Sequence, residues 1–158
     1  MRRETPQKIR DLQRGLYLKA KREPTFRFHL LHDQVWRADI LRQAYRLVCR
    51  NGGAPGSDGV TCPSRESGEG EAQFLAKLQQ ELKEKTDRPQ PVRRVYMPKG
   101  DGKQRPLGIP TLRDRVAQRA VKLVIAADFA DCSSGFGPQR DAHHAVGAIR
   151  EALSQGPP

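Results

Sequence analysis

Apolar residues recur every three or four positions in several stretches of the chain, which is the spacing of an amphipathic helix. These apolar stripes cover residues 9–20, 36–48, 74–82, 116–124 and 142–153. Asp33 is placed to cap the second predicted helix, and the third is expected to run from Phe74 to about Lys85. Thr111-Leu-Arg-Asp114 resembles a capping box at the start of the fourth. In the last helix, Ala142, Val146, Ile149 and Leu153 are expected to face inward.

A different pattern separates the third and fourth helices. Val92–Tyr96 and Arg105–Ile109 suit strands, and Asp101-Gly102 between them is a strong turn signal. Prolines at 98, 106 and 110 confine this ribbon to a sheet edge, where missing amide donors cost least. The pattern therefore predicts an α+β fold, mostly helical, with one short antiparallel β-hairpin at residues 92–110.

Glycine and proline mark the connections. Residues 51–59 hold four glycines and a proline, so this loop stops the second helix, but no strand precedes it and it lacks the lysine of a phosphate-binding P-loop. Residues 62–72 are rich in Pro, Ser, Gly and Glu and predict a flexible linker. The predicted organisation is N-terminal helices with the Gly-rich loop at 1–61, the linker at 62–72, and a second unit at 73–158.

Composition excludes several classes of protein. No apolar run approaches the roughly 20 residues of a membrane-spanning helix, and the polar residues after Arg3 do not suit a secretory signal, so we expect a cytoplasmic protein with no membrane partner. Cys49, Cys62 and Cys132 are far apart and form no Cys-x-x-Cys pair, so we expect reduced thiols. We expect no metal site in this chain.

The charge of the chain is strongly positive and unevenly distributed. It carries 29 Lys and Arg against 18 Asp and Glu, a net charge of +11. Residues 1–50 hold 13 basic and 5 acidic side chains, and residues 93–122 hold 9 and 2. Two basic blocks of this kind favour a nucleic-acid partner over a merely solvated basic surface. The outer face of the first helix, with Arg10 and Arg14, is a candidate phosphate-contacting surface.

The predicted hairpin concentrates cations. They are Arg93, Arg94, Lys99, Lys103 and Arg105. Arginine offers paired donors to phosphate and lysine a point charge, so the ribbon suits a triphosphate or a nucleic-acid backbone. Charges on an edge ribbon can also serve simply to prevent aggregation.

Several long motifs resemble one family, the group II intron-encoded reverse transcriptases. The motifs are Val92-Arg-Arg-Val-Tyr-Met-Pro-Lys99, Lys103-Gln-Arg-Pro-Leu-Gly-Ile-Pro-Thr111, Asp114-Arg-Val-Ala-Gln118, Gly135-Phe136 with Pro138 and Arg140, and Gly53-Ala-Pro-Gly56. They follow the order of that family's fingers region over nearly the whole chain. The resemblance implies that residues 73–158 form a fingers subdomain that grips template RNA and the incoming dNTP.

The resemblance also implies roles for individual residues. Lys99 and Arg105 would contact the dNTP triphosphate, Arg93 would line the same pocket, and Ile109 would pack near the templating base. Residues expected to bind RNA are Arg10, Arg14, Arg94, Lys103, Arg113 and Arg140. The implied partners are template or intron RNA, an RNA/DNA duplex and dNTP.

The family's catalytic carboxylates have no counterpart in this sequence, which contains no adjacent pair of aspartates. We therefore predict no catalytic residue here, and Mg²⁺ binding only together with a complementing palm domain, supplied by another chain or by further sequence. An alternative is a stand-alone, non-catalytic RNA-binding protein or intron RNA chaperone. A third hypothesis is the barely folded remnant of a decayed mobile element.

Overall fold

The computed structural model describes residues 5–23, 25–62, 68–100 and 102–125, with residues 146, 147, 150 and 154. In this part of the chain, five helices and one two-stranded antiparallel sheet follow one another. They are α1 (Gln7–Arg22), α2 (Leu31–Val35), α3 (Ala38–Arg50), α4 (Gly68–Lys83), β1 (Arg93–Pro98), β2 (Gln104–Ile109) and α5 (Leu112–Ile125). The predicted α+β fold, mostly helical with one hairpin, is confirmed.

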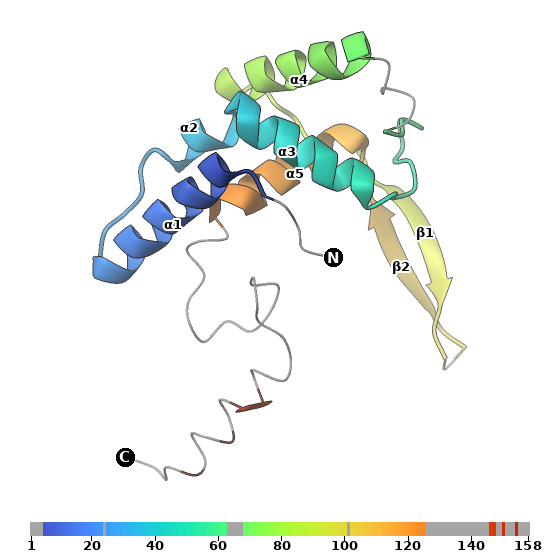
Figure 1. Ribbon diagram of the computed structural model, residues 1–158. Helices are drawn as coiled ribbons and strands as arrows, with labels where there is room; N and C mark the ends of the chain where they lie inside the picture. Colours follow the sequence, from blue (N-terminus) through green and yellow to red (C-terminus); the bar gives the residue numbers. More distant parts are fainter. Residues whose placement is uncertain are drawn as a thin grey trace.

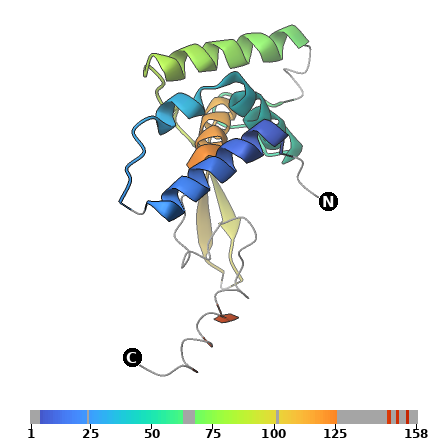
Figure 2. The same ribbon diagram turned by 60° about the vertical axis from the view of Figure 1, so that its left-hand side comes forward.

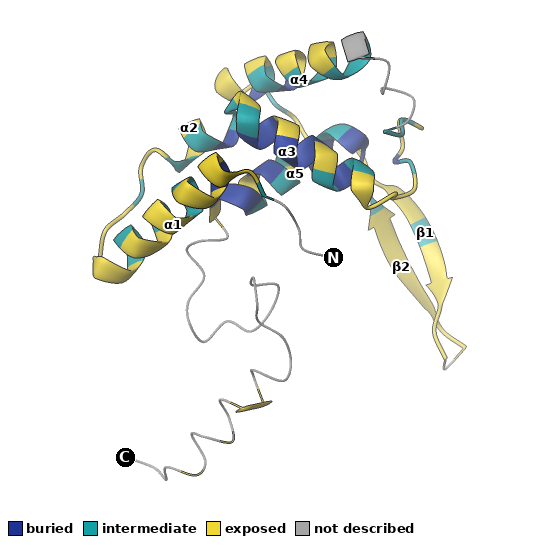
Figure 3. Cartoon of the chain, viewed as in Figure 1, coloured by how far each residue is buried: buried dark blue, intermediate teal, exposed yellow. Residues whose placement is uncertain are grey.

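Helices α3 and α5 pack against each other at the centre of the molecule, and α1, α2 and α4 lie around them (Figure 1). Their shared face is apolar and buried, whereas α1 and α4 expose most of their outer surface (Figure 3). The core is built from Ile9, Ile40, Leu41, Ala44, Leu78, Leu112, Val116, Ala120 and Val124, among others. Each of these positions belongs to a predicted helical stripe or lies beside one, because helical spacing gathers apolar side chains on one face.

Two glutamine side chains tie the outer helices to the centre. Gln13 Nε2 of α1 donates to the backbone oxygen of Leu123 at 2.8 Å. Gln79 Nε2 of α4 donates to the backbone oxygen of Trp36 at 2.9 Å. Both bonds join segments far apart in the sequence, and they use carbonyls at or beyond helix ends that have no partner within their own helix.

The second predicted helix is divided in two, so the cap expected at Asp33 is wrong. Asp33 lies inside α2, and the backbone of Arg37 is extended, at φ −59° and ψ 137°, before α3 begins. Arg37 forms an ion pair with Asp39, with 2.8 Å between Nη2 and Oδ2, and Asp39 Oδ1 accepts the N–H of Ile40. Burial acts to raise the pKa of Asp39, but the hydrogen bond and charge of Arg37, with the Ile40 N–H, outweigh it and lower the pKa.

Helix α4 begins earlier than predicted. Its first residue is Gly68, so residues 68–72 of the expected linker are helical, while residues 63–67 lie outside the described residues. Leu78 and Leu82 of α4 join the same core as α3 and α5. The division into units at 1–61 and 73–158 stays a prediction. Side chains from both ranges contribute to this one core.

The hairpin extends away from the helices (Figure 2). Its register pairs Arg93 with Ile109 and Pro98 with Gln104. Most of its residues are exposed, and only Val95 and Ile109 are half-buried. At the turn, Gly102 adopts a φ of 77°, a conformation that glycine reaches without steric cost.

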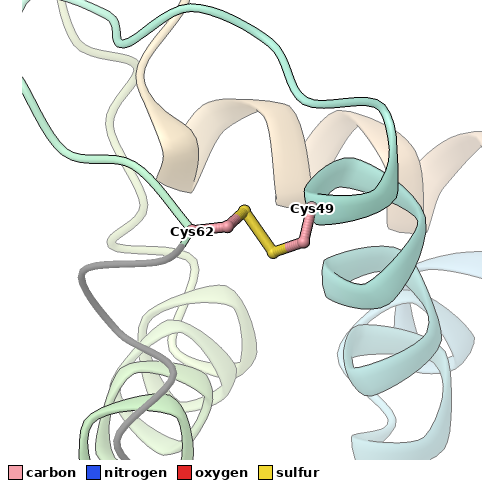
Figure 4. The surroundings of a disulfide bond; sticks show 2 residues. All are labelled: Cys49 and Cys62. Atoms are coloured by element: carbon pink, nitrogen blue, oxygen red, sulfur yellow. A yellow bond between two sulfur atoms is a disulfide. The ribbon is translucent and has the colours of Figure 1, made fainter.

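Two cysteines expected to be free thiols are joined. Cys49 at the end of α3 and Cys62 after the Gly-rich loop form a disulfide, with 5.3 Å between their Cα atoms (Figure 4). The expectation failed because the loop folds back on α3 and brings together residues 13 positions apart, a proximity that no spacing rule predicts. Cys132 lies outside the described residues.

The last predicted helix falls almost entirely outside the described residues. Val146, Gly147, Arg150 and Ser154 are helical and exposed. Val146 is 64% exposed, so its expected inward orientation is wrong. A side chain with this much of its surface in water is not packed in the core. Ala142, Ile149 and Leu153 lie outside the described residues.

Candidate nucleic-acid interface

The buried carboxylate of Asp114 holds both ends of the hairpin. Its Oδ2 accepts the hydroxyl of Thr111 at 2.8 Å and the backbone N–H of Gln90 at 3.1 Å. The N–H of Asp114 in turn donates to Thr111 Oγ1 at 3.3 Å, which is the N-cap bond of the predicted capping box, while the carboxylate of Asp114 binds the hydroxyl of Thr111. Gln90 precedes β1 and Thr111 follows β2, so one side chain fixes the base of the ribbon against α5.

The Gly-rich loop packs against the same base. A Cβ atom at Gly56 would lie 2.7 Å from the backbone of Pro110 and Thr111, so only glycine permits this approach. Ser57 Oγ donates to the backbone oxygen of Pro91 at 2.6 Å. The loop and hairpin, which are separate motifs in the sequence, therefore meet at one place.

Strand pairing places the residues predicted to bind ligands on two different faces of the hairpin. Arg93 pairs with Ile109 and Met97 pairs with Arg105, so Arg93, Arg105 and Ile109 lie on one face of the ribbon. Arg94 pairs with Gly108 and lies on the opposite face. The register thus separates three of the residues predicted to bind dNTP from one predicted to bind RNA.

Lysines lie at the tip of the hairpin. The backbone N–H of Lys99 donates to the oxygen of Lys103 at 2.7 Å, so the two residues are opposite each other beyond the last strand pair. Both are exposed. Within the described part of the chain, the side chains of Arg93, Lys99 and Arg105 have no hydrogen-bond or ion-pair partner. Among the described residues, these three cations are therefore exposed and have no internal counter-charge.

On α1, Arg10 and Arg14 are exposed one helical turn apart. Arg10 Nε donates to the backbone oxygen of Thr5 at 2.8 Å, which leaves the rest of its guanidinium exposed. Arg140, also predicted to bind RNA, lies outside the described residues.

Arg113 is half-buried and is held by two carboxylates. Its guanidinium binds the carboxylates of Glu81 and Asp87, with 3.0 Å between Nε and Glu81 Oε2, and Nη1 donates to the backbone oxygen of Arg88. The expectation that Arg113 contacts RNA is not supported by this geometry, because its donors already hold the segment after α4 against α5.

Sequence reasoning gave no individual role to Arg115 and Arg119. Both line a small pocket between α5 and the end of α3. The sequence shows only that they share the basic face of a helix; the nearby glycine loop that completes the pocket is brought there by the fold.

A larger open pocket, with a volume of about 720 Å³, lies between the Gly-rich loop, α4 and the start of α5. Its lining includes Ser57, Phe74 and Arg113 but none of the four residues predicted to bind dNTP.

Among the described residues, no three His, Cys, Asp or Glu side chains are grouped to hold a metal ion. None of the described helices combines the length and apolar character needed to cross a membrane.

Comparison with known proteins identifies the class. No family model matches the chain. Sequence similarity over most of its length nevertheless shows that it is related to the group II intron reverse transcriptases and maturases, which confirms the resemblance described above. It is 38% identical over 128 residues, 78% of the chain, to the group II intron-encoded protein LtrA of Lactococcus lactis subsp. cremoris. It is also 38% identical over 152 residues, 92% of the chain, to protein YkfC of Escherichia coli strain K12. The matched regions make up 21% of LtrA and 39% of YkfC, so the chain spans well under half of these relatives.

Proposed function

We propose that this chain is the fingers portion of a group II intron-type RNA-directed DNA polymerase, binding template RNA and the triphosphate of an incoming dNTP. Its similarity to a group II intron-encoded protein supports the class. The hairpin supports the mode of binding, because it presents a basic face on a rigid base.

The observation that carries the proposal is the shared face of Arg93, Arg105 and Ile109. Guanidinium groups supply paired N–H donors to phosphate oxygens, and the two arginines lie on one face, four residues apart along the ribbon. Lys99, one residue beyond the end of β1, adds a point charge at the tip of the hairpin. Ile109 supplies an apolar surface beside the cations, as a nucleotide base requires. These four residues have complementary roles toward one nucleotide.

RNA binding is assigned to other exposed cations. Arg10 and Arg14 on α1, Arg94 on the opposite hairpin face and Lys103 at its tip are all exposed. With a net charge of +11, the chain attracts phosphate backbones at long range. The contacts are to phosphate, so we propose binding with little sequence preference.

Nucleotide transfer requires more than this surface. The 3′-hydroxyl of a primer attacks the α-phosphorus, and the bond to pyrophosphate breaks; two Mg²⁺ ions held by carboxylates stabilise both oxygens. We propose that a palm domain, in further sequence or another chain, supplies those carboxylates. The hairpin cations would orient the triphosphate and offset the charge of the departing pyrophosphate. We propose a cytoplasmic location.

The first test is RNA binding, measured by fluorescence anisotropy with a labelled 12-nucleotide oligouridylate over a range of salt concentrations. Substituting Arg10, Arg14 and Arg94 with Ala should weaken binding and lower the slope of log K against log salt by about 0.7 for each phosphate that the variant no longer binds. The control changes Arg42, Arg46 and Arg50, three exposed arginines of α3, to Ala with the same loss of charge. Equal effects of the two triple variants would contradict the assignment.

The second test concerns the nucleotide. Titration with dTTP, followed through the arginine Nε–H signals in ¹⁵N NMR spectra, should shift Arg93 and Arg105 and leave Arg42 unchanged. When a palm domain is added, the Lys99→Ala/Arg105→Ala variant should lose primer extension while retaining most of its RNA affinity. RNA binding without any dTTP response at the hairpin would favour the stand-alone RNA-binding hypothesis.

A further inference from the structure

A second cluster of cations lines a pocket away from the hairpin faces. Arg115, Arg119 and Lys122 follow one another at intervals of four and three residues, so they share one face of α5. This face closes a pocket of about 360 Å³ with Val48 and Gly53 from the end of α3 and the loop that follows. Three positive side chains therefore surround one small volume.

These cations are partly removed from water. The Nε atoms of Arg115 and Arg119 are buried and have no hydrogen-bond partner in the described part of the chain. The described residues that line the pocket include no carboxylate. A buried charged donor without a partner destabilises the fold, so its presence is best explained by a ligand that supplies the missing acceptors.

The absence of a side chain at Gly53 leaves space for the guanidinium of Arg115. A Cβ atom at position 53 would lie 2.5 Å from Arg115 Nη1, so any side chain there displaces the guanidinium. The backbone of Gly53 is outside the left-handed region, so the close approach, and not the conformation, accounts for glycine at this position. The loop thus leaves space for one particular arginine.

We propose that this pocket binds a single phosphate group, donated by an RNA strand that passes the base of the hairpin. Two guanidinium groups and an ammonium match the charge and the several oxygens of a phosphate. Arg115 lies in the first turn of α5, six positions after the end of β2, and the loop that carries Gly53 packs on that junction. The identity of the strand rests on the proposed function; the phosphate chemistry rests on the pocket alone.

The direct test follows the arginine Nε–H signals of the full chain by ¹⁵N NMR during two titrations, one with inorganic phosphate and one with a 12-nucleotide oligouridylate. The Arg115 and Arg119 signals should shift with the oligonucleotide. A shift with inorganic phosphate as well means that a free anion also enters the pocket; both results support the site. No shift of either arginine with either ligand overturns it.

Variants give an independent test. Arg115→Gln with Arg119→Gln should weaken oligouridylate binding about tenfold, the range expected when charged hydrogen bonds are removed, and lower the salt slope by about 0.7. Gly53→Ala should weaken binding without changing the charge of the protein, because it moves Arg115. Gly15→Ala, where a Cβ meets no atom within 4 Å, is the matched control and should bind like the wild type.

The outcomes separate this inference from the proposed function. If the Arg10, Arg14 and Arg94 substitutions weaken RNA binding but the pocket variants do not, the pocket inference is wrong and the proposed function stands. If the wild-type chain binds no RNA and inorganic phosphate still shifts Arg115 and Arg119, the pocket is a phosphate site and the RNA function fails.

Discussion

Asp114 accepts a hydrogen bond from the backbone N–H of Gln90, a residue 24 positions earlier in the chain. The same carboxylate oxygen holds Thr111, so a residue shortly before β1 and a residue shortly after β2 meet on one buried side chain. A hairpin that leaves the helices has few apolar contacts of its own. Its orientation toward a ligand therefore depends on this polar attachment.

Asp114→Ala should destabilise the protein by about 1–3 kcal/mol, because it leaves the Gln90 N–H and the Thr111 hydroxyl without their acceptor. Urea unfolding measures the change in stability. Asp33→Ala, at an exposed position of α2, is the control and should change stability little. Equal stabilities of the two variants would show that the attachment contributes nothing.

Arg113→Ala separates a structural role from RNA binding. Removing the guanidinium leaves the carboxylates of Glu81 and Asp87 close together and partly buried, so we expect a decrease of about 1–2 kcal/mol in unfolding free energy. The salt slope of RNA binding should remain that of the wild type. A slope reduced by about 0.7 with normal stability would restore the RNA-binding assignment.

The disulfide predicts a redox-dependent stability. It closes a loop of 13 residues, for which the chain-entropy model gives about 3 kcal/mol. Thermal melting of the oxidised protein should occur at a higher temperature than melting with dithiothreitol. Cys62→Ser should melt like the reduced protein under both conditions. In a cytoplasmic location, the thiol pool would keep the pair reduced.

The ion pair of Asp39 predicts an acid effect on stability. The pKa of this carboxyl is lowered from its ordinary value of 3.8, so its contribution is present above that value and disappears as the pH falls through the lower folded-state pKa. Asp39→Asn should cost up to about 1 kcal/mol at pH 7, since both side chains are more than one-third exposed. The difference in melting temperature between variant and wild type should shrink as the pH falls below 3.8. A difference that stays constant with pH would exclude the ion pair as its cause.

Local patterns in the sequence were enough to predict the local structure. Two strand-forming segments on either side of Asp101-Gly102 predicted the hairpin, and Thr111 with Asp114 predicted the start of α5, because turn and cap geometry depend on residues a few positions apart. The same reasoning failed at Trp36 and Arg37. Helical spacing continues across them, but the extended backbone of Arg37 ends one helix before the next begins.

In the candidate site, too, local features could be predicted from the sequence and contacts between distant residues could not. Its cations, and the family to which it is related, could be identified from motifs along the chain. The sequence by itself determined which residues are basic and, apart from the break at Arg37 and the start of α4, which of the described segments are helix or strand. Only the tertiary structure decided which cations face outward together, that Arg113 is held by two carboxylates, that Cys49 meets Cys62, and that Gly53 makes room for Arg115. Those relationships join residues far apart in the sequence, and their distances are set by how the helices pack, which no local pattern specifies.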